Sequence, residues 1–439
     1  MVDVNKFACM AKKGDFASPN ASSQYRPNLE LEPTHMSINL VFDIKNKKAN
    51  GSVVTTIRSN SNGILNINLD ATKLNIFDIK SYSSQGNNKL TTNWTYDGRK
   101  INISWDKTWE KNEERNLDIT YEVVRPIAGL YFSYPNDYDE NAPIFVGADH
   151  ETERARYWLP CIDHPSVRCT LDFTLTSEMH HTILANGKLI NEVINEKEKI
   201  KTSKWNLDFP CPSYLTTICI GELESFIDRE ANAGNGPIPV AYYTTKKHQS
   251  ADLGRSFDKT PEMLEWMVKK LGVPLPYPKY FQYALPTHGG AMENISLVSW
   301  NDNFVLDEVL NKEFSWLVDQ INIHEMAHSW FGDAVVMKDF AHAWLKESWA
   351  TYMETVWLED KVSKEEGDYD RFVNERRYIN ETKRYVRTIV TNRYDSSWDL
   401  FDGHLYPGGA QRIDMLRKLL GDNIFWPSIT EYLTIFEKV

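Results

Sequence analysis

The sequence predicts a multidomain α+β protein, with an antiparallel, sandwich-like all-β domain over residues 1–230 followed by a mostly helical domain over residues 231–439. Three observations lead to this fold class. The chain has 439 residues, more than one hydrophobic core usually supports. Short runs of alternating apolar and polar residues fill residues 33–226, and helical periodicity replaces them after a Gly- and Pro-rich break at residues 232–239.

The first half has the pattern of an antiparallel β domain. Residues 53–57 are β-branched throughout, which favours the pleated and half-buried surface of a strand. Dipeptides typical of hairpin turns recur between the runs: Asn50-Gly51, Asn62-Gly63, Asp97-Gly98 and Asn186-Gly187. The expected strands cover residues 36–44, 52–58, 64–69, 100–105, 116–124 and 169–175.

The second half has the pattern of a helical domain. Thr260 and Pro261 open an amphipathic segment that Gly272 ends, which is typical of a helix with proline in its first turn and glycine after its last. Further helices are expected over residues 312–331, 343–360, 369–388, 410–420 and 426–436.

Composition and charge exclude several classes of protein. The net charge of −12 argues against a nucleic-acid partner, because such binding depends on clustered Lys and Arg. The longest apolar runs, such as residues 214–221, are far shorter than the roughly 20 residues that span a bilayer, so we expect no membrane-spanning segment. Residues 1–20 lack the apolar stretch of a secretory signal, which favours a cytoplasmic location. A periplasmic or secreted location stays open if a signal peptide has been removed.

The cysteines give no sign of a disulfide framework or of a thiolate metal site. There are five, an odd number, and no two stand in a C-x-x-C pair. We expect them to be mainly buried thiols: Cys9, Cys161, Cys169, Cys211 and Cys219.

One segment carries a strong metal-binding motif. His324, Glu325 and His328 form H-E-x-x-H in a stretch with helical periodicity. Residues four apart are separated by about 40° around a helix axis, so both imidazoles point to one side and can share one metal ion. Glu325 then lies beside the metal without binding it, where its carboxylate can deprotonate a water molecule.

A catalytic zinc site normally needs a third protein ligand, and Glu347 is the candidate. Eighteen residues separate it from His328, and it stands on a second expected helix that follows a turn over residues 332–340. Two neutral imidazoles and one carboxylate suit Zn²⁺ and leave its fourth position open. The sequence therefore predicts one zinc ion per chain.

A second motif makes the chain similar to a known family. Residues 289–294 read Gly-Gly-Ala-Met-Glu-Asn. Together with H-E-x-x-H, 18 intervening residues and Glu, this hexapeptide resembles the M1 (gluzincin) aminopeptidases, the family of aminopeptidase N and leukotriene A4 hydrolase. Residues 156–165 and 277–280 also resemble family segments, so the similarity covers roughly residues 33–420.

The resemblance implies a thermolysin-like catalytic domain over residues 231–439 and a role for each matching residue. The zinc ligands would be His324, His328 and Glu347, and Glu325 would be the general base. Tyr406 would donate a hydrogen bond to the developing oxyanion. The residues implied in substrate binding are Glu151, Gly289, Gly290, Ala291, Met292 and Glu293. Of these, Glu293 and Glu151 would hold the free α-ammonium group of the substrate, and the glycines would let its backbone approach.

The sequence departs from the family pattern at Lys346, Ser348 and Gly408. None of these residues is an expected zinc ligand, so we expect the departures to affect the reaction rate and the substrate specificity rather than zinc binding. Family members also usually continue into a helical C-terminal domain. The chain stops at Val439, so that domain is expected to be absent or truncated.

The predicted function is a zinc metallo-aminopeptidase that removes the N-terminal residue of peptides with a free N-terminus, using zinc-activated water, Glu325 and Tyr406. Two alternatives stay open. One is epoxide hydrolysis on a lipid, an activity of one branch of the family. The other is a non-catalytic scaffold of the same fold. The sequence gives neither the preferred N-terminal side chain nor the oligomeric state.

Overall fold

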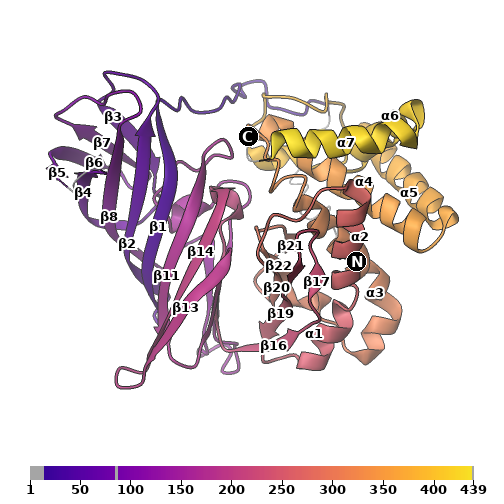
Figure 1. Ribbon diagram of the computed structural model, residues 1–439, viewed down its shortest axis with the longest axis horizontal. Coiled ribbons are helices and arrows are strands. Elements are labelled where there is room, and N and C mark those ends of the chain that lie inside the picture. The colour runs from indigo at the N-terminus through magenta and orange to yellow at the C-terminus, as the bar shows by residue number, and fades with distance from the viewer. Residues whose placement is uncertain (1–13, 85–87, 438–439) are drawn as a thin grey trace.

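The computed structural model describes residues 14–84 and 88–437 and has two parts, as Figure 1 shows. A first part built from strands, in indigo and magenta, lies beside a second part in which helices surround a smaller sheet. This arrangement confirms the fold class expected from the sequence. Cys9 lies outside the described residues. None of the helices in the described part of the chain is long and apolar enough to cross a membrane.

An eight-stranded sheet forms most of the first part. In β8, every second residue is buried, so one face of the sheet supplies core residues such as Leu117 and Ile119. One pair departs from the expected antiparallel arrangement, because β1 and β11 run parallel. The spatial order is β13 (Lys188–Asn195), β14 (Ile200–Pro212), β11 (Arg168–Glu178), β1 (Leu31–Asp43), β2 (Lys48–Ser59), β8 (Glu114–Val124), β4 (Asn75–Ser83) and β5 (Lys89–Leu90).

Two smaller sheets complete the first part. The three-stranded sheet is joined to the large sheet by a hydrogen bond of 2.9 Å from Trp105 Nε1 to Ser81 Oγ. In the four-stranded sheet, β15 is buried along its whole length. The three-stranded sheet contains β3 (Asn66–Asp70), β7 (Lys100–Trp105) and β6 (Thr92–Tyr96); the four-stranded sheet contains β12 (Thr182–Ala185), β15 (Ile218–Gly221), β10 (Phe145–Asp149) and β9 (Gly129–Ser133).

The second part is built on a five-stranded sheet. Its first strand, β16, lies before residue 230 in the chain but pairs with β19. The sheet of the second part therefore includes residues that precede residue 230. The domain boundary at residue 230 stays a prediction. A short hairpin of β17 (Ala231–Asn232) and β18 (Pro237–Ile238) follows. The sheet order is β16 (Leu223–Ile227), β19 (Val240–Thr245), β20 (Tyr280–Leu285), β22 (Leu297–Asn301) and β21 (Ala291–Met292).

Seven α-helices occur among the described residues, and their ends have local causes. The helix expected from Thr260 is confirmed as α2, and Gly272 ends it with a left-handed φ of 67°. The helix α3 begins at Glu308, earlier than expected, because the Asp307 side chain accepts hydrogen bonds from the backbone amides of Val309 and Leu310. The helices are α1 (Ser250–Ser256), α2 (Thr260–Leu271), α3 (Glu308–His328), α4 (Trp344–Lys361), α5 (Lys364–Thr382), α6 (Pro407–Leu420) and α7 (Asp422–Phe436).

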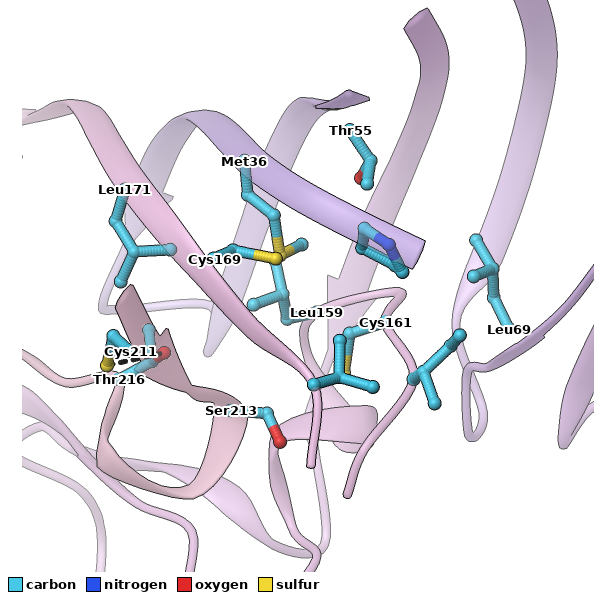
Figure 2. Close-up of a pocket in the computed structure, with 13 residues that line it drawn as sticks. Met36, Thr55, Leu69, Leu159, Cys161, Cys169, Leu171, Cys211, Ser213 and Thr216 are labelled. Carbon is cyan, nitrogen blue, oxygen red and sulfur yellow. Dashed lines mark hydrogen bonds between the residues drawn. The ribbon is translucent and has the colours of Figure 1, made fainter. Parts of the chain in front are cut away.

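The cysteines within the described residues are buried and unpaired, as the sequence predicts for them. Figure 2 shows Cys161, Cys169 and Cys211 around a cavity of about 20 Å³ in the first part, together with apolar side chains such as Met36. Burial raises the pKa of the Cys169 thiol to about 12. The thiol is therefore protonated at neutral pH and is poorly reactive.

Candidate metal centre and active site

Two helices bring three candidate metal ligands together. His324 and His328 lie in the last turns of α3, and Glu347 lies in the first turn of α4. Glu347 Oε2 is 3.2 Å from His324 Nε2 and 3.4 Å from His328 Nε2. On a tetrahedral zinc ion with bonds of about 2.0–2.1 Å, neighbouring ligand atoms stand about 3.3 Å apart. Both distances match this spacing, and the ligand atoms of all three residues lie within 4.8 Å of one another, as a shared zinc ion requires.

Hydrogen bonds hold both imidazoles with Nε2 toward the centre. His324 Nδ1 lies 2.7 Å from Glu354 Oε1, and His328 Nδ1 lies 3.0 Å from the carbonyl oxygen of Phe331. Each acceptor places a proton on Nδ1, so the lone pair of Nε2 is available to a metal ion. The sequence did not single out Glu354. Its spacing in the sequence could have indicated this contact, because Glu354 lies seven residues after Glu347 on α4 and therefore on the same face of the helix.

Glu325 is buried beside this centre, with only 6% of its surface exposed. Its Oε2 atom has no hydrogen-bond partner among the described residues, which is unusual for a buried carboxylate. Burial raises the pKa of Glu325 well above its ordinary value, whereas the neighbouring His324 lowers it. An unpartnered, buried carboxylate next to a metal site is suited to accepting a proton from water.

Two further carboxylates lie near the three ligands, each supplied by a different sheet. Glu151 follows β10, and Glu293 lies in the loop between β21 and β22. Oxygen atoms of Glu151, Glu293 and Glu347 lie within 4.8 Å of one another, and all three side chains are buried. We call these three residues the acidic cluster.

Contacts of both neighbouring residues fix Glu151 in place, and one of them joins the two parts of the chain. The residue before it, His150, accepts a hydrogen bond of 2.7 Å from Trp158 Nε1. The residue after it, Thr152, has its Oγ1 2.6 Å from Ser397 Oγ in the second part. The acidic cluster therefore depends on how the first part packs against the second.

Lys346 is a residue of this site to which the sequence gave no definite role. Its Nζ lies 2.5 Å from Glu151 Oε1, 2.7 Å from Glu293 Oε1 and 2.6 Å from Glu347 Oε1. Burial would lower the pKa of Lys346, but the three carboxylates raise it well above its ordinary value. Burial would also raise the pKa of Glu347, but Lys346 and the imidazoles hold it well below its ordinary value. Lys346 is thus an ammonium ion and Glu347 an ionised carboxylate.

Tyr406 also lies beside the metal ligands. It stands directly before α6, and its ring stacks on His324 with centroids 6.1 Å apart. The segment is fixed to α4 by a hydrogen bond of 2.7 Å from Ser348 Oγ to the carbonyl oxygen of Leu405. Gly409 packs so closely on Ser348 that a Cβ atom would overlap it. Ser348, noted as a departure from the family pattern, therefore positions the segment that carries Tyr406.

The glycine-rich hexapeptide lies at one edge of the five-stranded sheet. Ala291 and Met292 form the edge strand β21 and pair with Trp300 and Ser299 of β22. Beside Gly290, a Cβ atom would meet nothing within 4 Å. The strand edge next to the acidic cluster thus has open space beside it.

A candidate metal centre between two helices, with a glutamate beside it and the edge of a strand nearby, is the arrangement of a zinc peptidase. Two family models match the chain, the "Peptidase M1 N-terminal domain" over residues 32–215 and the "Peptidase family M1 domain" over residues 255–439. The chain belongs to peptidase family M1, which confirms the resemblance found in the sequence.

The chain is also similar to proteins that are named as aminopeptidases. The puromycin-sensitive aminopeptidase of Caenorhabditis elegans is 29% identical over 74% of this chain and 34% of its own length. Aminopeptidase N of Lactobacillus delbrueckii subsp. lactis is 28% identical over 77% of this chain and 41% of its own length. The chain thus spans less than half the length of these relatives.

Solved structures share the fold. An M1 zinc metallopeptidase from Deinococcus radiodurans superimposes with a TM-score of 0.76 at 21% sequence identity. The match covers 97% of this chain and 90% of the other.

Proposed function

We propose that the protein is a zinc-dependent aminopeptidase that hydrolyses the first peptide bond of peptides. The observation that carries this proposal is the convergence of His324 Nε2, His328 Nε2 and Glu347 Oε2 at the spacing of tetrahedral zinc ligands. When bound there, zinc would supply a Lewis acid for the scissile carbonyl and for water.

Glu325 is the proton carrier in this proposal. Its unpartnered Oε2 would accept a proton from the attacking water, and the same carboxyl group would return the proton to the leaving amine. Burial raises the pKa of Glu325 well above its ordinary value, which makes this carboxylate a stronger base toward the attacking water.

Tyr406 and the edge strand would orient the reaction. The Tyr406 ring stacks on His324, which supports a role for its phenol as a hydrogen-bond donor to the carbonyl oxygen on which negative charge develops. An extended peptide could pair with the outer edge of β21, and the open space beside Gly290 would let its backbone approach.

Glu293 and Glu151 would bind the substrate's α-ammonium group. They are buried beside the metal ligand Glu347, so a peptide whose ammonium group binds them would have its first peptide bond near the metal. An internal peptide bond lacks this ammonium group and would gain nothing from the two carboxylates. This is the physical reason for proposing an aminopeptidase rather than an endopeptidase.

The test is hydrolysis of a panel of fluorogenic aminoacyl substrates by zinc-loaded protein, with and without the substitution Glu325→Gln. We expect turnover by the wild type and a loss of about 10²- to 10⁴-fold in the variant, with stoichiometric zinc in both proteins. Retained activity in Glu325→Gln would reject the role given to this residue.

Adding a lipid epoxide to this panel separates the alternatives. Hydrolysis of a lipid epoxide without hydrolysis of any aminoacyl substrate would favour an epoxide hydrolase. Stoichiometric zinc without either activity would favour a non-catalytic scaffold.

A further inference from the structure

A second group of possible metal ligands lies in the first part of the chain, at the turn that joins β11 to β12. The turn carries Glu178, His180 and His181, and one ligand atom from each residue lies within 4.8 Å of the others. A hydrogen bond of 3.0 Å from the backbone amide of His181 to the carbonyl oxygen of Glu178 closes the turn over four residues. The turn therefore gathers two imidazoles and one carboxylate on a short piece of chain.

His181 has a buried ring with one nitrogen left over. Only 1% of the residue is exposed. Its Nδ1 lies 2.8 Å from Ser177 Oγ, and Nε2 has no hydrogen-bond partner among the described residues. Burial lowers the pKa of His181, and the neighbouring His180 lowers it further, so the ring is neutral at neutral pH. With its proton on Nδ1, toward Ser177, the neutral ring offers the lone pair of Nε2 to a metal ion.

His180 lies between two carboxylates. Its Nδ1 is 3.8 Å from Glu178 Oε2, and its Nε2 is 3.2 Å from Glu222 Oε1. The ring centroids of His180 and His181 are 4.5 Å apart. A histidine that binds a metal through one nitrogen commonly has a carboxylate on the other, which orients the ring and increases its basicity. Glu222 is placed to hold His180 in this way while Nδ1 faces Glu178.

The fold fixes Glu222 beside the turn. Strands β12 and β15 are antiparallel with Thr182 opposite Gly221, so the next residues outward, His181 and Glu222, lie at the same end of the pair. Glu222 is also the single residue between β15 of the first part and β16, which belongs to the sheet of the second part. Its other oxygen, Oε2, lies 2.8 Å from Lys246 Nζ. An ion at the turn would therefore lie next to the junction of the two parts.

We propose that Glu178, His180 and His181 bind a second divalent ion of the zinc class, with Glu222 holding the ring of His180. Two imidazoles and one carboxylate are donors that suit Zn²⁺ and leave a further position for water. The side chains of Glu178 and His180 are 60% and 50% exposed, so an ion can reach them from solvent. This site is separate from the candidate metal centre of α3 and α4 and does not depend on the proposed function.

The experiment measures bound zinc by elemental analysis after equilibrium dialysis against micromolar zinc. We expect about two ions per chain in the wild type and about one in His180→Ala, which loses a ligand of the second site. His328→Ala, which loses a ligand of the candidate metal centre, should also hold about one ion, and the double variant should hold about none.

His248→Ala is the matched control. Its imidazole is 24% exposed and faces a single carboxylate, with Nε2 3.4 Å from Asp302 Oδ2. This variant should keep as much zinc as the wild type. Glu178→Gln changes an exposed ligand and replaces His180→Ala if that variant does not fold.

A second measurement uses the stability of the protein. Zinc should raise the Tm of His328→Ala by about 2 °C or more, because the ion binds the folded site and not the unfolded chain. It should leave the Tm of the double variant unchanged.

Three results would overturn the inference. They are an equal zinc content in the wild type and in the variants of the turn, a difference that appears only at millimolar zinc, or an equal loss of zinc in His248→Ala. The proposed function fails separately, if the zinc-loaded wild type hydrolyses no aminoacyl substrate, and the zinc content of the variants can still be compared in that case.

Discussion

Removing the charge of Glu354 by Glu354→Gln should weaken zinc binding, although this residue cannot reach the metal itself. Glu354 Oε1 accepts a hydrogen bond of 2.7 Å from His324 Nδ1, and the two side chains are only 12% and 13% exposed. The second oxygen, Oε2, accepts a hydrogen bond of 2.6 Å from Gln320 Nε2. The carboxylate therefore fixes the orientation of the imidazole and increases its basicity.

The size of the effect follows from similar contacts at other metal sites. Loss of such a partner typically costs 10- to 100-fold in metal affinity, or about 1.4–2.8 kcal/mol. The amide oxygen of glutamine can still accept the hydrogen bond, so we expect a loss near the lower limit, about tenfold.

The loss should increase with pH. Burial would lower the pKa of His324, but hydrogen bonds to Glu347 and Glu354 raise it well above its ordinary value in the metal-free protein. At lower pH, zinc must therefore displace a proton that Glu354 helps to hold, and the substitution partly relieves this competition. As the pH rises, less of the protein carries this proton, and the loss of orientation and basicity becomes the larger part of the effect.

The assay is competition for zinc between the protein and a chelator of known affinity, in weakly acidic and in alkaline buffer. Asp360→Asn is the matched control, because it removes one carboxylate from the same helix, where Asp360 pairs with Lys270 at the surface. Wild-type zinc affinity of Glu354→Gln in alkaline buffer, or an equal loss in Asp360→Asn, would refute the reasoning.

Two further predictions concern the segment around Tyr406. Tyr406→Phe should lower kcat by about 10²- to 10³-fold, as the loss of other oxyanion donors does, and should leave the zinc content unchanged. Steady-state kinetics measure kcat, and elemental analysis measures the zinc content. An unaltered kcat would contradict the role given to the phenol. Burial would raise the pKa of Asp402, but hydrogen bonds from His404 and Arg387 lower it from 3.8 to about 2. Because the folded-state pKa lies below the unfolded one, Asp402 contributes about 2 kcal/mol of stability above pH 4 that is lost as the pH falls toward 2. Urea unfolding should therefore show that Asp402→Asn costs less stability at pH 2 than at neutral pH, and an equal cost at both would count against the depressed pKa.

The fold class could be predicted because both halves of the chain have clear periodicity. Strands of the large sheet such as β8 alternate buried and half-buried residues, and this pattern is visible in the sequence. The five-stranded sheet of the second part was not predicted. Strands such as β19 and β22 are buried almost throughout, and periodicity cannot distinguish such short apolar runs from buried helix segments.

The metal ligands could be predicted because they depend on helix geometry. The spacing of His324 and His328 on one helix fixes the relative direction of their side chains, whichever fold surrounds them. The role of Lys346 could not be predicted in the same way. Its partners Glu151 and Glu293 lie 195 and 53 residues away in the chain.

The sequence by itself predicted the three candidate zinc ligands and the place of Glu325 beside them, because local helix geometry and the two motifs carry that information. Only the tertiary structure showed that the acidic cluster encloses Lys346, because its carboxylates come from the loop after β10, the loop after β21 and the helix α4. The packing of the two parts of the chain brings these three segments together around the ammonium group of Lys346.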